Sequence, residues 1–116
     1  MNQINRSHNW QKKLDLELNK IVKSLKRNYK PEKIILFGSA AHGNTGPDSD
    51  LDILIVKKGI DELPRYKRSM AIRKLIDSDM PIDFLVYTPY ELKKRLYLED
   101  PFIQQIIEEG KVLYGA

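Results

Sequence analysis

The stretch from Gly38 to Asp52 reads G-S-A-A-H-G-N-T-G-P-D-S-D-L-D. It places a Gly-Ser turn directly after one apolar run and two aspartates, at alternate positions, at the start of another. Glycine lets backbone N–H groups come close to a ligand, so such a turn can hold phosphate if a short helix begins there. A carboxylate pair that stays ionised calls for a cation. The stretch predicts a phosphate turn and a carboxylate pair close together.

The aspartates of this stretch predict a metal site. Side chains alternate across a strand, so Asp50 and Asp52 share one face while the apolar residues between and after them share the other. We expect helices on the apolar face, and we expect the carboxylate face to stay open because burying two unpartnered anions is costly. Asp83 holds the equivalent place in the apolar run Ile82–Tyr87. Three such carboxylates suit Mg²⁺ or Mn²⁺, and two ions about 3.5–4 Å apart commonly serve phosphoryl transfer.

Each of these features alone is more often only structural. A Gly-Ser pair after a strand is usually a turn, and D-x-D at a strand end is more often solvated than metal-bound. The combination of the turn, the spacing and the third aspartate favours a site. The turn lacks the lysine of a Walker A loop, and G-x-G-x-x-G is also missing.

The rest of the chain predicts a mixed arrangement of helices and strands. Helices are expected over about Asn9–Asn28, Leu63–Asp79, Pro89–Leu98 and Phe102–Glu109, and strands over Lys33–Gly38, Leu51–Val56, Ile82–Tyr87 and Lys111–Tyr114. Thr88 and Glu91 form a capping box. The predicted fold class is α/β (α+β), with a small mixed sheet and helices mainly on one face. The first two strands run antiparallel because only a tight loop joins them.

Length and composition indicate one packed domain. The chain has 116 residues, of which 41% are hydrophobic and 31% charged, so residues 1–116 are expected to form a single domain with residues 1–8 as a flexible leader. The absence of cysteine and the presence of only two histidines argue against thiolate and all-imidazole metal sites. No apolar run approaches the ~20 residues of a spanning helix, which predicts a cytoplasmic protein without membrane contact. The net charge of +4 suits an anionic ligand.

Five segments carry a family resemblance: Glu32–Ser39 (E-K-I-I-L-F-G-S), Gly43, Ser49–Val56 (S-D-L-D-I-L-I-V), Ile82–Val86 (I-D-F-L-V) and Glu109–Tyr114 (E-G-K-V-L-Y). Together they closely resemble the minimal nucleotidyltransferases, a branch of the DNA polymerase beta-like superfamily. The resemblance covers roughly residues 29–114.

The resemblance implies a site, a reaction and a partner. The implied nucleotide-binding residues are Gly38, Ser39 and Ser49, and the implied catalytic ligands of two Mg²⁺ ions, or Mn²⁺, are Asp50, Asp52 and Asp83. Asp83 would also help to activate the attacking hydroxyl. The implied reaction transfers AMP from ATP to a partner protein and releases pyrophosphate. The implied partner is a HEPN-domain toxin whose tyrosine is modified, with this chain as its antitoxin.

The phosphate turn departs from the family pattern at Ala40 and His42. The family often has basic residues there, and a histidine that is neutral for much of the time at pH 7 is a poor replacement for arginine. We therefore expect weaker phosphate contact, unless other cations compensate; the candidates are Arg65, Arg68, Lys57 and Lys58. His42 is equally compatible with a purely structural place in the loop.

Other functions remain open from the sequence. One alternative is a binding module with a degenerate nucleotide site, which neutralises its partner by direct contact. A small-molecule acceptor such as an aminoglycoside would need a further binding region, and a nucleic-acid acceptor lacks aromatic residues among the basic ones. Leu54 and Val56, on the carboxylate side of their strand, indicate that something covers part of that face. The sequence leaves open the acceptor, the base preference, the number of groups transferred and whether homo- or hetero-oligomers form.

Overall fold

The computed structural model describes residues 3–43, 46 and 48–115 of the chain. In chain order these residues form α1 (Gln3–Asn28), β1 (Lys33–Phe37), the 3-10 helix η1 (Gly38–His42), β2 (Leu51–Val56), α2 (Arg65–Arg73), β3 (Ile82–Tyr87), α3 (Pro89–Tyr97), α4 (Pro101–Glu109) and β4 (Lys111–Tyr114). Within this part of the chain, no helix is long and apolar enough to cross a membrane.

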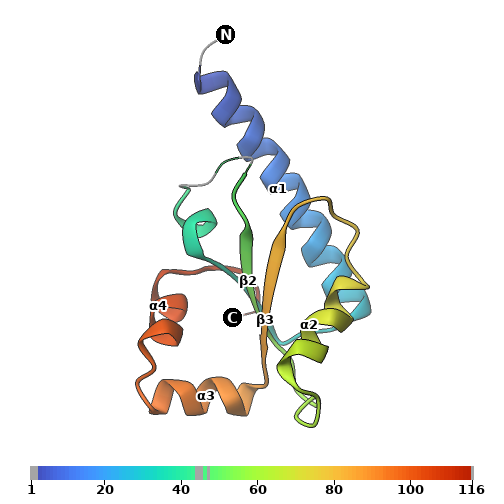
Figure 1. Ribbon diagram of the computed structural model, residues 1–116, viewed down its shortest axis with the longest axis vertical. Helices are drawn as coiled ribbons and strands as arrows, with labels where there is room; N and C mark the ends of the chain where they lie inside the picture. The colour runs from blue at the N-terminus through green and yellow to red at the C-terminus, as the bar shows by residue number, and fades with distance from the viewer. Residues whose placement is uncertain (1–2, 44–45, 47, 116) are drawn as a thin grey trace.

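The strands form one mixed sheet in the order β3-β2-β1-β4 (Figure 1). β1 runs antiparallel to both β2 and β4, whereas β2 and β3 are parallel and are joined by a crossover that contains α2. The predicted mixed α/β class is confirmed, as is the antiparallel pairing of the first two strands across their short connection. β2, β3 and β4 have the predicted bounds, and β1 ends one residue before Gly38.

One face of the sheet packs against α1 and α2. The apolar stripe of α1 recurs at three- and four-residue steps, which places it on one side of the helix. Its members Leu14, Leu18, Ile21 and Leu25 are all buried. They meet inward-facing sheet residues, among them Ile34, Leu36, Ile53, Ile55 and Val86, and α2 contributes Ile72 to the same cluster.

The opposite face of the sheet is covered in part by α3 and α4 (Figure 1). Leu54 and Val56 point to this face and are buried together with Ile35, Tyr87, Ile103 and Ile106. The sequence indicated that something covers these two residues, and α3 and α4 of the same chain cover them. Helices were expected mainly on the other face, and α1 and α2 do lie there; α3 and α4 were not assigned to this side. At one end of this face Asp52 is half-buried and Asp83 is exposed, whereas the apolar residues Leu54 and Val56 beyond them are buried.

Helix α1 begins earlier than expected and ends where expected. It starts at Gln3 rather than near Asn9, so residues 3–8 of the predicted leader continue the helix, while residues 1 and 2 lie outside the described part. After Asn28 the chain turns at Lys30, whose φ is 57°. Its N–H donates to the carbonyl of Leu25 at 2.8 Å before Pro31 stops the hydrogen-bond ladder.

Helix α2 is shorter than predicted. The apolar spacing predicted a helix over Leu63–Asp79, but α2 covers only Arg65–Arg73. The chain leaves the helix after Arg73, and the carbonyl of Leu75 accepts a hydrogen bond from the Ser24 hydroxyl on α1 at 2.7 Å. This long-range hydrogen bond therefore holds the chain outside the helix at a position where the local apolar spacing alone predicts helix.

The ends of α3 and α4 follow their predicted signals. The Thr88 hydroxyl accepts from the Glu91 N–H at 3.1 Å, and the Glu91 carboxylate accepts from the Thr88 N–H at 2.8 Å, which completes the capping box. Asp100 caps α4. Gly110 ends α4 as predicted, and a Cβ there would lie 2.6 Å from Cγ2 of Ile35. Glycine thus lets the chain pass directly from α4 into β4.

Candidate active site

The turn after β1 is a short 3-10 helix that begins at Gly38. Gly38 has a φ of 73°, in the left-handed region that favours glycine. A Cβ added to it would lie 2.5 Å from Oδ2 of Asp52. Two independent constraints therefore require glycine here: the backbone angle and the closeness of the carboxylate. A short helix therefore begins directly after β1, as the binding of phosphate by the backbone of this turn requires.

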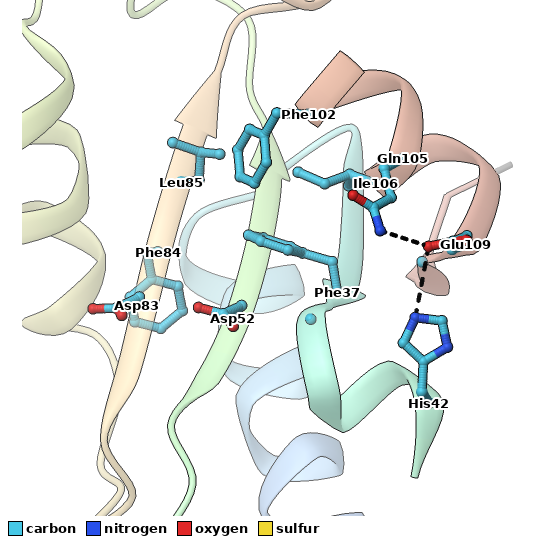
Figure 2. Close-up of a pocket in the computed structure, with 12 residues that line it drawn as sticks. Phe37, His42, Asp52, Asp83, Phe84, Leu85, Phe102, Gln105, Ile106 and Glu109 are labelled. Atoms are coloured by element: carbon cyan, nitrogen blue, oxygen red, sulfur yellow. Dashed lines mark hydrogen bonds and ion pairs between the residues drawn. The ribbon is translucent and has the colours of Figure 1, made fainter. Parts of the chain in front are cut away.

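Asp52 and Asp83 face each other across neighbouring parallel strands. They are register partners of β2 and β3, and both line one pocket together with Gly38 (Figure 2). Burial raises the pKa of Asp52 above its ordinary value, and the charges of Asp83 and then Asp50 raise it further. Asp50, just before β2, is exposed. The three predicted carboxylates thus act on one another electrostatically, with Asp52 and Asp83 adjacent.

The described aspartate side chains do not by themselves form a complete set of metal ligands. Among the described residues, no group of three or more histidine, aspartate or glutamate side chains is positioned to hold a metal ion. Burial raises the pKa of Asp52 most, and repulsion by the charges of Asp83 and Asp50 adds to this effect. The structure brings together Asp52 and Asp83, and Asp50 contributes its charge from outside the pocket lining.

The predicted nucleotide residues lie around the turn in different settings. Gly38 lines the pocket, whereas Ser39 is exposed on η1 and is not among the lining residues. The Ser49 hydroxyl accepts a hydrogen bond from the Gly46 N–H at 3.2 Å, so it supports the loop before β2. Its own proton remains available to a ligand.

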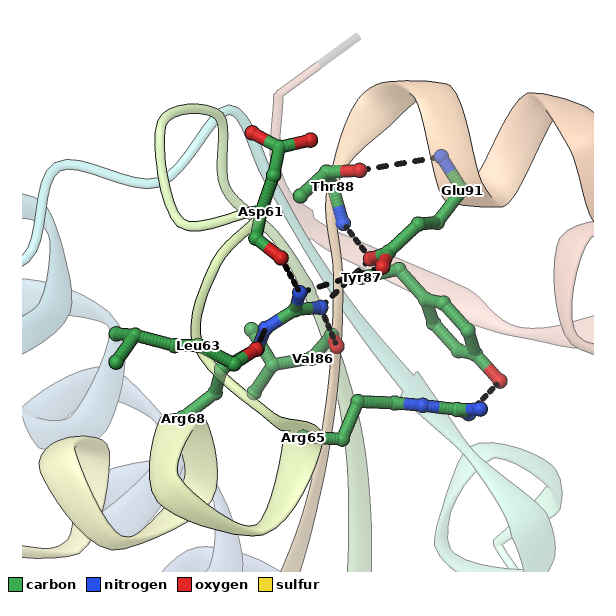
Figure 3. A network of polar contacts seen from close by, with 8 residues as sticks. All are labelled: Asp61, Leu63, Arg65, Arg68, Val86, Tyr87, Thr88 and Glu91. Atoms are coloured by element: carbon green, nitrogen blue, oxygen red, sulfur yellow. Dashed lines mark hydrogen bonds and ion pairs between the residues drawn. The ribbon is translucent and has the colours of Figure 1, made fainter.

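The cations proposed to compensate for the phosphate turn are engaged elsewhere. Arg68 is 2% exposed and donates to Glu91 at 2.6 Å and to the carbonyl of Leu63 at 2.7 Å (Figure 3). Arg65 donates to the Tyr87 hydroxyl at 2.8 Å. Two of the four candidates are therefore committed to holding α2 against β3 and α3.

The two lysine candidates give no support to the turn either. Lys57 lies over the Tyr29 ring, 5.4 Å from its centroid, and donates to the Lys30 carbonyl at 3.2 Å. Lys58 is exposed, and its backbone N–H donates to the Glu32 carboxylate at 2.9 Å. Among the residues that the structure describes, the contacts of these four residues lead away from the turn, and none of them supports the suggestion that one supplies the missing charge there.

The Arg68–Glu91 pair joins three elements in one polar network. Arg68 also donates to the carbonyl of Val86, at the end of β3, at 3.2 Å. The hydrogen bond from Arg68 lowers the pKa of the Glu91 carboxyl, and the Thr88 N–H adds to this effect against the opposing influence of burial. The buried polar residue of α2 is therefore satisfied by partners from β3 and α3. Tyr66 and Met70, large apolar residues of the same helix, are exposed.

The sequence did not single out Arg73, which is the cation next to the carboxylates. Its Nη2 lies 3.8 Å from Oδ1 of Asp83 and donates to the Ile82 carbonyl at 2.7 Å. The guanidinium also lies over the Phe84 ring, 5.9 Å from its centroid. No motif marks this residue, because its position depends on how α2 packs against β3.

His42 belongs to a second polar group at the other side of the pocket. Its Nε2 lies 3.8 Å from Oε2 of Glu109 on α4, and the Gln105 amide donates to the same carboxylate oxygen at 2.9 Å (Figure 2). Gln105 and Glu109 were assigned no function from the sequence, since polar residues on a helix usually face solvent.

The pocket has a volume of about 550 Å³, within the range of small-ligand sites. Its described lining comes from β1, η1, β2, β3 and α4 and consists of Phe37, Gly38, His42, Asp52, Asp83, Phe84, Leu85, Phe102, Gln105, Ile106, Glu109 and Gly110. It therefore combines a carboxylate end, an apolar wall and a polar end. Such a pocket can take a ligand with an anionic group that a cation bridges to the carboxylates.

Comparison with known proteins gives a consistent result. Residues 18–114 match the family described as Nucleotidyltransferase domain. The protein adenylyltransferase MntA of Shewanella oneidensis is 30% identical over 103 residues, which cover 87% of this chain and 67% of that protein. MJ0604 of Methanocaldococcus jannaschii, provisionally assigned as a protein adenylyltransferase, is 33% identical over 99 residues, 84% of this chain and 94% of that protein. A crystal structure of a toxin–antitoxin with AMP-PNP matches with a TM-score of 0.57 at 30% identity, over 85% of this chain and 73% of that one.

Proposed function

Because the chain belongs to the nucleotidyltransferase domain family, we propose that it transfers AMP from ATP to a hydroxyl of a partner protein. The partner would be a HEPN-domain toxin in the cytoplasm, which the chain neutralises as antitoxin by forming a hetero-oligomer with it and modifying it. Support comes from relatives named protein adenylyltransferases and from the likeness to a toxin–antitoxin solved with AMP-PNP.

The observation that carries the proposal is the adjacency of Asp52, Asp83 and Gly38 in one pocket. Nucleotidyl transfer needs oxygen ligands for divalent cations beside a place for phosphates. Carboxylate oxygens are the ligands that Mg²⁺ and Mn²⁺ take. Burial raises the pKa of Asp52, the charges of Asp83 and Asp50 raise it further, and a bound cation would oppose these effects. Asp52 and Asp83 therefore fit as two oxygen ligands of a divalent metal, whose other ligands would include phosphate oxygens of the nucleotide.

The proposed roles of the residues rest on the family resemblance, together with the positions of Gly38, Asp52 and Asp83 in the pocket. Asp50, Asp52 and Asp83 would hold two Mg²⁺ ions, which when bound neutralise phosphate charge and orient the reacting oxygens. The backbone after Gly38 and the hydroxyls of Ser39 and Ser49 would hold the triphosphate by donating hydrogen bonds. Most of the rate enhancement would come from positioning and charge neutralisation.

The transfer step makes one bond and breaks one. The acceptor hydroxyl oxygen bonds to the α-phosphorus of ATP, and the bond from that phosphorus to the oxygen bridging to the β-phosphate breaks, so pyrophosphate leaves. Asp83 takes the hydroxyl proton. Its side chain is 72% exposed, so an acceptor on another protein can reach it.

The proposal is tested by following the label of α-phosphate-labelled ATP in the presence of Mg²⁺ and the protein encoded beside this chain. We expect label on the partner protein with the wild type and none with the combined Asp50→Ala and Asp52→Ala variant. Asp79→Ala is the matched control, because Asp79 is exposed and does not line the pocket. Absence of transfer by the wild type, or transfer that survives the double substitution, would disprove the proposal.

A second candidate is a binding module that neutralises its partner without catalysis. It is favoured by the weak basic charge of the phosphate turn, where His42 contacts Glu109. Arg65 and Arg68, on α2, bind Tyr87 and Glu91 instead. Titration calorimetry separates the two functions. Partner binding that is unaffected by the aspartate substitutions, with no affinity for Mg–ATP, would favour the binding module.

A further inference from the structure

The pocket continues beyond the carboxylates over an apolar wall. Phe37, Leu85, Phe102 and Ile106 form this wall, and Gln105 and Glu109 close its far end. Figure 2 shows Phe37 between Asp52 on one side and Gln105 and Glu109 on the other. We propose that this wall is the subsite for the planar base of the nucleotide donor, an inference that rests on the proposed function.

The wall presents aromatic surface to a ligand. Phe37 and Phe102 meet edge to face, with ring centroids 5.9 Å apart and an interplanar angle of 82°. Phe102 is 51% exposed at the pocket rim, although it is a large apolar residue, and Ile106 behind it is buried. Nucleobases stack on such aromatic faces, and stacking would cover the exposed part of Phe102.

The far end of the pocket offers hydrogen-bond acceptors. The Gln105 amide nitrogen donates to Glu109 at 2.9 Å, which directs the N–H of the amide toward the carboxylate. The Gln105 oxygen and the Glu109 carboxylate then remain as acceptors at this end. A nucleobase carries N–H donors on its edge, so its chemistry complements this arrangement.

The same geometry disfavours an aromatic side chain of the acceptor protein in this subsite. The single hydroxyl of a tyrosine would have to reach the carboxylates in order to react, and its ring would then offer no donor to Gln105 and Glu109. A donor nucleotide has phosphates for the carboxylate end and a base edge for the polar end, so it uses both. The pocket volume of about 550 Å³ accommodates such a ligand.

The test compares ATP with a probe that lacks the base. Dissociation constants of Mg–ATP and of inorganic tripolyphosphate with Mg²⁺ are measured for the wild type and for Phe102→Ala and Gln105→Ala. We expect Phe102→Ala to weaken ATP binding by about five- to fiftyfold, from lost stacking, and to leave tripolyphosphate binding unchanged. Gln105→Ala should weaken ATP binding a few-fold with the same selectivity. Tyr97→Ala is the matched control, since Tyr97 is 85% exposed and lies outside the pocket lining.

Other outcomes overturn the proposal. If both variants bind ATP as the wild type does while the KM for the acceptor protein rises, the wall holds the acceptor. Equal loss of ATP and tripolyphosphate would mean that the substitutions only damage the fold. A different set of results is expected if only the proposed function is wrong. In that case Phe102→Ala still weakens ATP binding, but neither Mg²⁺ nor Asp52→Asn affects ATP binding, and no label is transferred.

Discussion

A Cβ placed on Gly38 would lie 2.5 Å from Oδ2 of Asp52, so the turn after β1 and the carboxylate of β2 are packed as one unit. Gly38 and Gly43 share a φ of 73°, but nothing lies within 4 Å of a Cβ at Gly43. Substitutions at these two glycines therefore separate the free-energy cost of the left-handed backbone angle from the cost of crowding Asp52.

Substitution of Gly38 should disturb the site as well as the fold. Gly43→Ala should lower the free energy of unfolding by about 1 kcal/mol, from the left-handed backbone alone. Gly38→Ala should cost at least as much and should also weaken Mg²⁺-dependent ATP binding more than about tenfold, because Asp52 must move. Urea unfolding and calorimetry measure the two effects. Equal ATP affinity in both variants would show that the contact with Asp52 is irrelevant to the site.

Arg68 should matter for stability rather than for phosphate binding. Removing it in Arg68→Met leaves the Glu91 carboxylate without its partner, which should cost about 3 kcal/mol of unfolding free energy. Arg65→Ala, the control, should cost only about 1 kcal/mol through the lost contacts with Tyr87. Both should retain wild-type ATP affinity when folded. A stable Arg68→Met variant that no longer binds ATP would place Arg68 in the chemistry instead.

Because the pKa of Asp52 is raised in the folded state, the direction of its effect on stability can be predicted at each pH. Its protonated form is favoured in the folded state, so its contribution to stability is complete below the ordinary pKa of 3.8 and is lost as pH rises through the raised value. Asp52→Asn should therefore increase the free energy of unfolding at pH 7 in EDTA, and the gain should disappear below pH 3.8. Urea unfolding across pH checks this, with Asp79→Asn as control. A loss of stability at pH 7 would contradict the burial and repulsion assigned to Asp52.

Arg73 should compete with divalent cations for the charge of Asp83. Its guanidinium lies 3.8 Å from that carboxylate, at an exposed position where such a pair is worth less than about 1 kcal/mol. Arg73→Ala should therefore tighten Mg²⁺ binding by about two- to fivefold. It should also cost about 1 kcal/mol of unfolding free energy through the lost hydrogen bond to the Ile82 carbonyl. Arg65→Ala, which removes a cation that binds Tyr87, should leave Mg²⁺ affinity unchanged. Weaker Mg²⁺ binding in Arg73→Ala would mean that Arg73 orients Asp83 rather than opposing the metal.

Local signals predicted much of the fold and the family. The strands were predicted because short apolar runs end at glycine, proline or charged residues, and the cap of α3 because Thr88 and Glu91 lie within a few residues of each other. The segments around Gly38, Asp50 and Asp83 carried the resemblance to nucleotidyltransferases, which the family match confirms.

Long-range contacts explain what the sequence did not predict. The burial of Arg68 depends on Glu91, which lies 23 residues later in the chain, so local apolar spacing could not predict it. The placement of α4 over Leu54 brings Gln105 into the pocket, and no local pattern records that packing. The roles of all the predicted site residues stay predictions, because they depend on a bound nucleotide and metal.

The most direct measurement of the central claim, that Asp52 and Asp83 beside Gly38 form a metal-dependent nucleotide site, is calorimetric titration of ATP with Mg²⁺ or EDTA present. The wild type should bind ATP only with Mg²⁺, and Asp52→Asn and Asp83→Asn should each weaken binding more than about tenfold, while Asp79→Asn binds as the wild type does. ATP binding that is equal with Mg²⁺ and with EDTA, or unchanged in both site variants, would contradict the claim.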